Sequence, residues 1–174
     1  METLVERAFA SEYEDVEYNI IHNNNEIEEE MPSLIHGWIQ RRLMKILFRT
    51  ILNGYEVLPP ITFKVTEKGY APDICVYPAS ELHLDLIDTN PTLNIAPILA
   101  IEIVSVSQGN IELIHKCIDM IKAGVETCWI LEPATGIVVV CTEKGRTSLH
   151  MGEFLHHPLL SDPISLDEIF DLHS

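Results

Sequence analysis

The chain has 174 residues, and 47% of them are apolar, which is enough to build the hydrophobic core of one domain. Its formal net charge of −16 argues against a generic nucleic-acid-binding protein, because such proteins are usually basic. No apolar run approaches the ~18 residues that a membrane-spanning helix needs, and the acidic N-terminus lacks the basic start of a secretory signal, so we expect a cytoplasmic protein.

The acidic residues are unevenly distributed along the chain. Residues 1–30 contain ten of the 27 acidic residues and a single base, Arg7. Residues 31–174 contain the other 17 acidic residues and ten bases, so this part has a net charge nearer to −7. We therefore predict an acidic N-terminal arm at 1–30 and a single domain at 31–174.

The predicted domain begins with a helix at 33–52. Apolar residues recur there at helical spacing, Ser33 is suited to the N-cap, and Asn53-Gly54 ends the pattern. Short runs rich in β-branched and aromatic residues follow, separated by turn residues. These runs predict strands at 55–58, 61–65 and 73–77, followed by a loop with one turn of helix at 78–97.

The most apolar segment of the domain lies at its centre. The run at 98–104 is typical of a strand buried on both faces. Together with the helix and strand predicted after it, this strand indicates a right-handed parallel crossover. The remaining predicted elements are a helix at 111–124, strands at 127–131, 136–141 and 147–150, and a helix at 165–170. The order predicts an α/β domain in which helices flank both sides of a mixed central sheet.

The cysteines are far apart in the sequence, and most have apolar neighbours. None forms a CxxC pair, so a metal-binding or redox motif of that kind is not indicated. We predict that all four are buried free thiols of a protein in a reducing compartment. They are Cys75, Cys117, Cys128 and Cys141.

Glu102 interrupts the apolar run at 98–104, where an ionised carboxylate is costly to bury unless it is paired or coordinates a cation. The alternation of a strand places it on the same face as Ala100 and Val104. Two interpretations are open at this point. The carboxylate is either half of a structural ion pair at a strand end or part of a functional site.

Asp73 favours the functional interpretation of Glu102. By itself, an aspartate that follows a proline at a strand start is usually a turn residue. Two carboxylates near the ends of neighbouring strands, however, form a site of hard oxygen ligands. Mg²⁺ prefers such sites and completes its coordination with water and phosphate oxygens.

Lys116 is the candidate cation of this site, because it lies on the helix predicted directly after the Glu102 strand. Glu112 stands four residues before it on the same helix face. The structural alternative is therefore a surface ion pair that stabilises the helix by ~0.3 kcal/mol. In the functional interpretation, a lysine beside two metal-binding carboxylates completes a site for phosphodiester cleavage.

The ordered set of these residues resembles the PD-(D/E)XK nuclease superfamily and, within it, the Uma-type restriction endonucleases. The resemblance covers about residues 30–170, and between Glu102 and Pro133 it needs no gap. No single motif is specific, but their order and spacing are. The matching residues are Pro72-Asp73, Glu102 to Ser105, Ser107, Glu112, Lys116, Ala123-Gly124-Val125, Trp129 and Glu132-Pro133.

The resemblance implies a restriction-endonuclease-like fold, an Mg²⁺-dependent endonuclease activity on DNA, with Mn²⁺ as a substitute, and specific residue roles. Asp73 and Glu102 would bind the metal as catalytic carboxylates. Val104 occupies the position of the lysine in the simplest form of the motif, so the catalytic lysine is implied to have moved to the following helix, as Lys116. His36 would be a supporting residue near the site, although a lone histidine on a helix is more often structural.

Four bases on the first predicted helix bear on the question of a DNA partner. Arg41, Lys45 and Arg49 recur every four residues, Arg42 lies beside them, and no acidic residue occurs between residues 31 and 55. This face either contacts phosphates or simply meets the acidic arm or solvent. With the high negative charge of the chain, we expect weak, salt-sensitive DNA binding, and a homodimer that doubles the basic face.

Two other functions use the same residues. A catalytically silent binding or assembly module would keep the fold without cleaving DNA, in agreement with the acidic composition. A metal-dependent hydrolase of a small phosphoester would need the carboxylates and the lysine but not the basic helix face.

Overall fold

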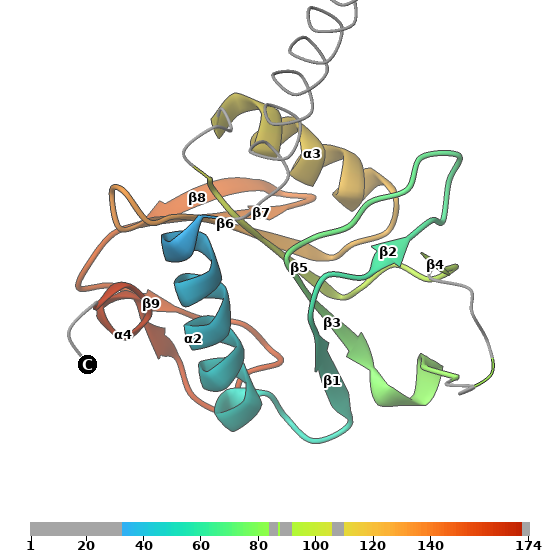
Figure 1. The fold of residues 1–174 in the computed structure, drawn as a ribbon, viewed down its shortest axis with the longest axis horizontal. Coiled ribbons are helices and arrows are strands. Elements are labelled where there is room, and N and C mark those ends of the chain that lie inside the picture. The colour runs from blue at the N-terminus through green and yellow to red at the C-terminus, as the bar shows by residue number, and fades with distance from the viewer. Residues whose placement is uncertain (1–32, 84–86, 88–91, 106–109, 172–174) are drawn as a thin grey trace, which may run out of the picture. The chain divides into compact units, whose positions relative to one another are not determined.

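The computed structural model describes residues 33–83, 87, 92–105 and 110–171 (Figure 1). The acidic arm predicted at 1–30 lies outside these residues. Within them, none of the helices has the length and apolar character needed to cross a membrane.

A six-stranded mixed sheet forms the centre of the described structure, in the order β1-β3-β5-β6-β7-β8. β5 and β6 are parallel, and every other neighbouring pair is antiparallel. The predicted strand–helix–strand unit is thus confirmed as a parallel pair of strands joined through a helix. The strands are β1 (Tyr55–Leu58), β3 (Ile74–Pro78), β5 (Leu99–Ile103), β6 (Thr127–Glu132), β7 (Ile137–Thr142) and β8 (Gly145–Leu149).

Helices cover both faces of this sheet, as predicted. On one face, α2 (Leu34–Thr50) and the short α4 (Leu166–Phe170) pack on side chains such as Ile101 and Trp129. On the other face, α3 (Asn110–Lys122) packs on side chains such as Ala100. Successive residues of β5 therefore belong to different hydrophobic clusters, because strand side chains alternate between the two faces. This explains why β5 is buried along its whole length.

The helix predicted at 33–52 ends two residues earlier, at Thr50. Ile51 instead makes an antiparallel bridge with Leu160, and the amide of Leu52 donates to the carbonyl of Leu159. Residues 51 and 52 thus pair with a segment distant in sequence and do not continue the helix. Gly54 follows with a φ of 94°, a conformation that glycine adopts without strain.

Several elements of only two or three residues complete the fold. β2 (Thr62–Phe63) pairs in parallel with β4 (Thr92–Leu93), and β9 (Phe154–Leu155) pairs antiparallel with β10 (Ile164–Ser165). The segment predicted as a loop at 78–97 contains β4 and a 3₁₀ helix, η1 (Ala79–Glu81). The prediction of a loop was therefore wrong at β4, because backbone pairing with β2 makes these two residues a strand.

All four cysteines are free and buried, as predicted. Burial raises the pKa of the Cys75 thiol to about 12 and that of Cys141 to about 11. Both thiols are therefore protonated at neutral pH, which makes them packing groups and not nucleophiles.

Candidate active site

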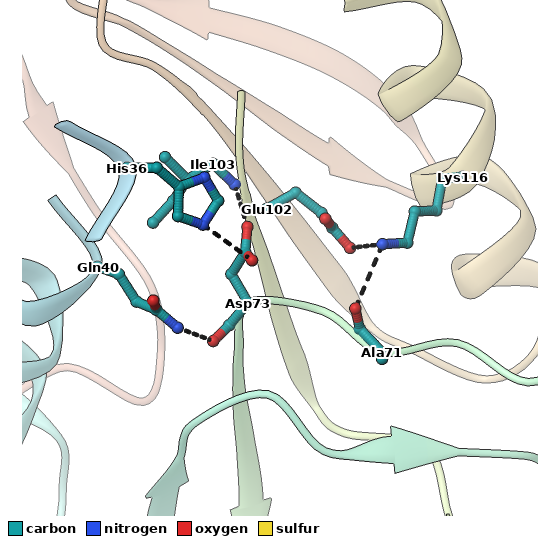
Figure 2. A network of polar contacts seen from close by, with 7 residues as sticks. All are labelled: His36, Gln40, Ala71, Asp73, Glu102, Ile103 and Lys116. Atoms are coloured by element: carbon teal, nitrogen blue, oxygen red, sulfur yellow. Dashed lines mark hydrogen bonds and ion pairs between the residues drawn. The ribbon is translucent and has the colours of Figure 1, made fainter. Parts of the chain in front are cut away.

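Asp73 directly precedes β3 and uses both of its carboxylate oxygens (Figure 2). Oδ2 accepts a hydrogen bond of 2.7 Å from the backbone amide of Ile103, the last residue of β5. Oδ1 lies 3.1 Å from Nε2 of His36. The carboxylate therefore takes the place of a backbone carbonyl where the pairing of β3 with β5 ends, and this holds Asp73 at the end of the sheet.

Two residues of α2 hold Asp73 from the side opposite to Glu102 (Figure 2). His36 contacts the carboxylate, and the Nε2 amide of Gln40 donates a hydrogen bond of 2.8 Å to the Asp73 carbonyl. The hydrogen bond to Asp73 is the main cause that raises the pKa of His36 above its ordinary value, against the lowering effect of burial. Sequence reasoning missed Gln40, although its spacing of four residues from His36 places both on one helix face.

Glu102 lies on the face of β5 that α3 covers, and only 4% of the residue is exposed. In the register of β3 and β5, Ile74 stands opposite Ile101. Because the strands are antiparallel, Asp73 and Glu102, the next residues outward, come to the same point of the sheet, and Figure 2 shows their carboxylates as neighbours. Tertiary structure thus brings together two acidic residues from opposite ends of the segment 73–102.

Lys116 reaches this point from α3. Its Nζ lies 2.7 Å from Oε1 of Glu102 and donates a hydrogen bond of 3.3 Å to the carbonyl of Ala71 (Figure 2). The predicted alternative, a surface pair with Glu112, is wrong, because the ammonium group turns inward and Glu112 is exposed. Lys116 therefore connects the glutamate of β5 with the segment that leads into Asp73.

The ionisation of Glu102 is strongly perturbed. Burial raises the pKa of its carboxyl to about 7, Lys116 opposes this rise, and the negative charge of Asp73 adds to it. The carboxyl is therefore partly protonated at neutral pH even with the lysine beside it. Perturbation by burial together with a neighbouring charge is typical of functional carboxylates, although structural ion pairs show it as well.

The chemistry of the two carboxylates fits a divalent cation. Two carboxylates lie side by side there, and ionised carboxylate oxygens are the ligands that hard divalent cations prefer. No cluster of three or more potential protein ligands occurs within residues 33–83, 92–105 and 110–171. Mg²⁺ commonly uses only one or two carboxylates and keeps water and phosphate oxygens in its other positions, so two ligands are enough for it.

The basic face of α2 divides into two parts in the structure. Arg42 donates hydrogen bonds to the backbone carbonyls of Glu168 and Asp171, and Arg49 pairs with the Glu168 carboxylate. These two bases therefore hold the C-terminal segment. Arg41 and Lys45 are exposed, and the Arg41 guanidinium lies 5.6 Å from the centre of the Trp38 ring.

Comparison with known proteins identifies a sequence family that matches the chain and a solved structure with a similar fold. The sequence profile of the Uma2 family, described as "Putative restriction endonuclease", matches residues 4–167. A crystal structure described as a putative nuclease belonging to DUF820, from Anabaena variabilis ATCC 29413, superposes with a TM-score of 0.73. The match covers 81% of this chain and 83% of that one at 19% sequence identity, so it is a likeness of fold. No curated protein matches the chain.

Proposed function

Because the chain belongs to the Uma2 family of restriction-endonuclease-like proteins, we propose that it is a divalent-metal-dependent nuclease that hydrolyses phosphodiester bonds of DNA. The observation that supports this proposal is the meeting of Asp73, Glu102 and Lys116 at one end of the central sheet. These residues come from three separate elements, and their charges suit the transfer of a phosphoryl group.

Asp73 and Glu102 are the residues that would hold Mg²⁺ or Mn²⁺. When bound, the metal supplies charge neutralisation on the phosphoryl group and lowers the pKa of a coordinated water. The protein contributes the position of the ligands. The Ile103 amide and His36 each contact one oxygen of the Asp73 carboxylate. These two contacts fix the orientation of the carboxylate group at the end of the sheet.

Lys116 provides the positive charge of the protein at the same place. Its Nζ pairs with Oε1 of Glu102 and donates a hydrogen bond to the Ala71 carbonyl. With a cation held by Asp73 and Glu102, the ammonium group of Lys116 would be available to donate hydrogen bonds to the attacking water or to a phosphate oxygen. Such a preorganised donor stabilises the charge that develops in the transition state.

The test of this proposal is cleavage of a supercoiled plasmid in the presence of Mg²⁺ or Mn²⁺. We expect nicked and linear products with the natural protein and a loss of at least about 100-fold in rate with Asp73→Asn and with Glu102→Gln. A matched control is Asp119→Asn, which removes an exposed carboxylate on α3 that pairs with Lys68 and Lys122. If cleavage survives in both site variants, the assignment of the site is wrong.

The second candidate is a catalytically silent module of the same fold. The ion pair of 2.7 Å between Lys116 and Glu102 favours it, because this pair already compensates the buried carboxylate without a metal. Titration calorimetry separates the two. A folded sample that releases no heat with Mn²⁺ at neutral pH and cleaves no DNA would be the silent module.

A further inference from the structure

The solvent-facing side of α2 carries two basic side chains flanked by two aromatic ones. Trp38, Arg41, Lys45 and Phe48 follow one another at spacings of three and four residues, so they lie on one line along the helix, here called the aromatic–basic stripe. Trp38 is 38% exposed and Phe48 is 64% exposed, and both bases are exposed. None of the four belongs to the residues with which α2 packs on the sheet.

Large aromatic side chains on a helix surface lose free energy by remaining in water, so their exposure suggests a surface that is covered when the protein acts. The Arg41 guanidinium lies 5.6 Å from the centre of the Trp38 ring. Arg42 and Arg49, on the flank of the stripe, hold the C-terminal segment instead. The stripe is thus distinct from the contacts that stabilise the fold.

We propose that the aromatic–basic stripe binds an unpaired stretch of a nucleic-acid strand. Trp38 and Phe48 stack on bases, and Arg41 and Lys45 contact the phosphates between them. This combination of stacking surfaces and cations is the one that recognises single strands, because every unpaired base exposes its faces. In a duplex the base faces are hidden, so Trp38 and Phe48 would gain nothing there. The proposal rests on the nuclease function and refines its substrate to DNA with an unpaired segment.

The place of the stripe agrees with this substrate. Its N-terminal end, at Trp38, lies on the same helix turns as His36 and Gln40, which hold Asp73 from the opposite side of α2. By helix geometry the stripe from Trp38 to Phe48 is about 15 Å long. A flexible single strand can follow this length, and the stripe begins on the helix turns that also position Asp73.

A second copy of the chain is the competing occupant, and charge argues against it. Two copies of α2 packed antiparallel about a twofold axis would set Trp38 against Phe48, which is favourable for apolar groups. The same axis would set Arg41 of one copy against Lys45 of the other. Four cations would then meet at the centre of the interface without an acidic partner on α2, and like charges at an interface are unfavourable. A polyanion has the complementary charge.

The experiment measures binding of the full-length protein to a labelled oligothymidylate of about 20 nucleotides, longer than typical single-strand sites. EDTA in the buffer prevents cleavage. Anisotropy gives the affinity, and tryptophan fluorescence gives the location, because Trp38 is accessible and Trp129 is fully buried. We expect binding to quench the fluorescence in the natural protein and not in Trp38→Phe, and a duplex of equal length to bind more weakly.

Variants separate stacking from charge and from folding. Trp38→Ala and Phe48→Ala should each weaken binding of the oligothymidylate at least about fivefold. Phe154→Ala is the matched control, since Phe154 is an aromatic residue on β9 that is 51% exposed. Arg41→Gln and Lys45→Gln should reduce the salt dependence of binding, whereas Lys144→Gln, an exposed base in the β7–β8 turn, should not.

Three results would overturn the proposal. One is the absence of binding, and another is equal affinity for single strand and duplex with no effect of the aromatic variants. The third is a dimer in sedimentation that Trp38→Ala converts to a monomer without a change in oligonucleotide binding, which would identify a second copy as the occupant. Failure of the nuclease function is seen separately, because oligothymidylate binding in EDTA and plasmid cleavage with Mg²⁺ are independent measurements.

Discussion

Nζ of Lys116 lies 2.7 Å from Oε1 of Glu102, which joins the middle of α3 to the buried strand β5. The lysine side chain is 31% exposed and that of the glutamate only 5%. The pair therefore reaches from solvent to the interior at the place where Asp73 also lies. Even with this partner, burial keeps the pKa of Glu102 raised to about 7, so an additional positive charge would be favourable there.

The raised pKa of Glu102 predicts how the stability of the metal-free protein depends on pH. As pH rises from about 4.5 to 7, the unfolded chain releases this proton before the folded protein does, so stability falls. The difference is roughly 3 kcal/mol. We expect Glu102→Gln to remove this loss, so that the variant gains stability relative to the natural protein between pH 4.5 and pH 8.

Urea unfolding at several pH values measures this effect. Comparison of Glu102→Gln with the natural protein cancels the pH dependence that other groups contribute to both. One such group is His157, because burial lowers its pKa and its protonation at acidic pH destabilises the fold. Glu112→Gln is the control, because Glu112 is an exposed carboxylate on the same helix as Lys116. A stability difference between Glu102→Gln and the natural protein that stays constant with pH would show that Glu102 titrates normally.

Asp73→Asn should change the titration of His36. The hydrogen bond to Asp73 is the largest cause of the raised pKa of His36, and burial acts in the opposite direction. Removal of the carboxylate charge should therefore bring this pKa down to its ordinary value of about 6.5 or below it. Imidazole signals in an NMR titration report it directly. His157, which contacts Thr127 and the edge of Trp129, serves as the internal control, and an unchanged His36 would contradict the contact.

Binding of a divalent cation should release protons at slightly acidic pH. Near pH 6.5 Glu102 is largely protonated, and a cation bound to Asp73 and Glu102 displaces this proton; near pH 8.5 it has none to release. Calorimetry with Mn²⁺ in buffers of different ionisation enthalpy counts the protons. His36→Gln separates any proton released by the neighbouring imidazole. Release that is independent of pH would argue against Glu102 as a ligand.

Lys116→Met should reduce plasmid cleavage by at least about 100-fold while the protein stays folded. Lys122→Met is the matched control, because Lys122 lies on the same helix and pairs with Asp119 at the surface. Circular dichroism melting of both variants shows whether the fold is intact. Equal cleavage rates for the two variants would remove Lys116 from the proposed mechanism.

Hydrophobic periodicity is sufficient to predict the main elements of this fold. It places a helix at 33–52, observed as Leu34–Thr50, and a buried strand at 98–104, observed as Leu99–Ile103. These patterns are local and come from burial of one helix face or of both strand faces. β4, β9 and β10 escape such reasoning, because strands of two residues exist through pairing with another segment and carry no periodicity of their own.

The sequence by itself determined the layered α/β architecture and the chemical groups available to the site, since both depend on the types and spacing of neighbouring residues. Only the tertiary structure decided which groups meet. Lys116 pairs with Glu102 and not with Glu112, which is nearer in the sequence. An unpaired charge costs more free energy on a buried carboxylate than on an exposed one. In the same way, Gln40 is directed to Asp73 and Arg42 to the C-terminal segment by packing of elements far apart in the chain.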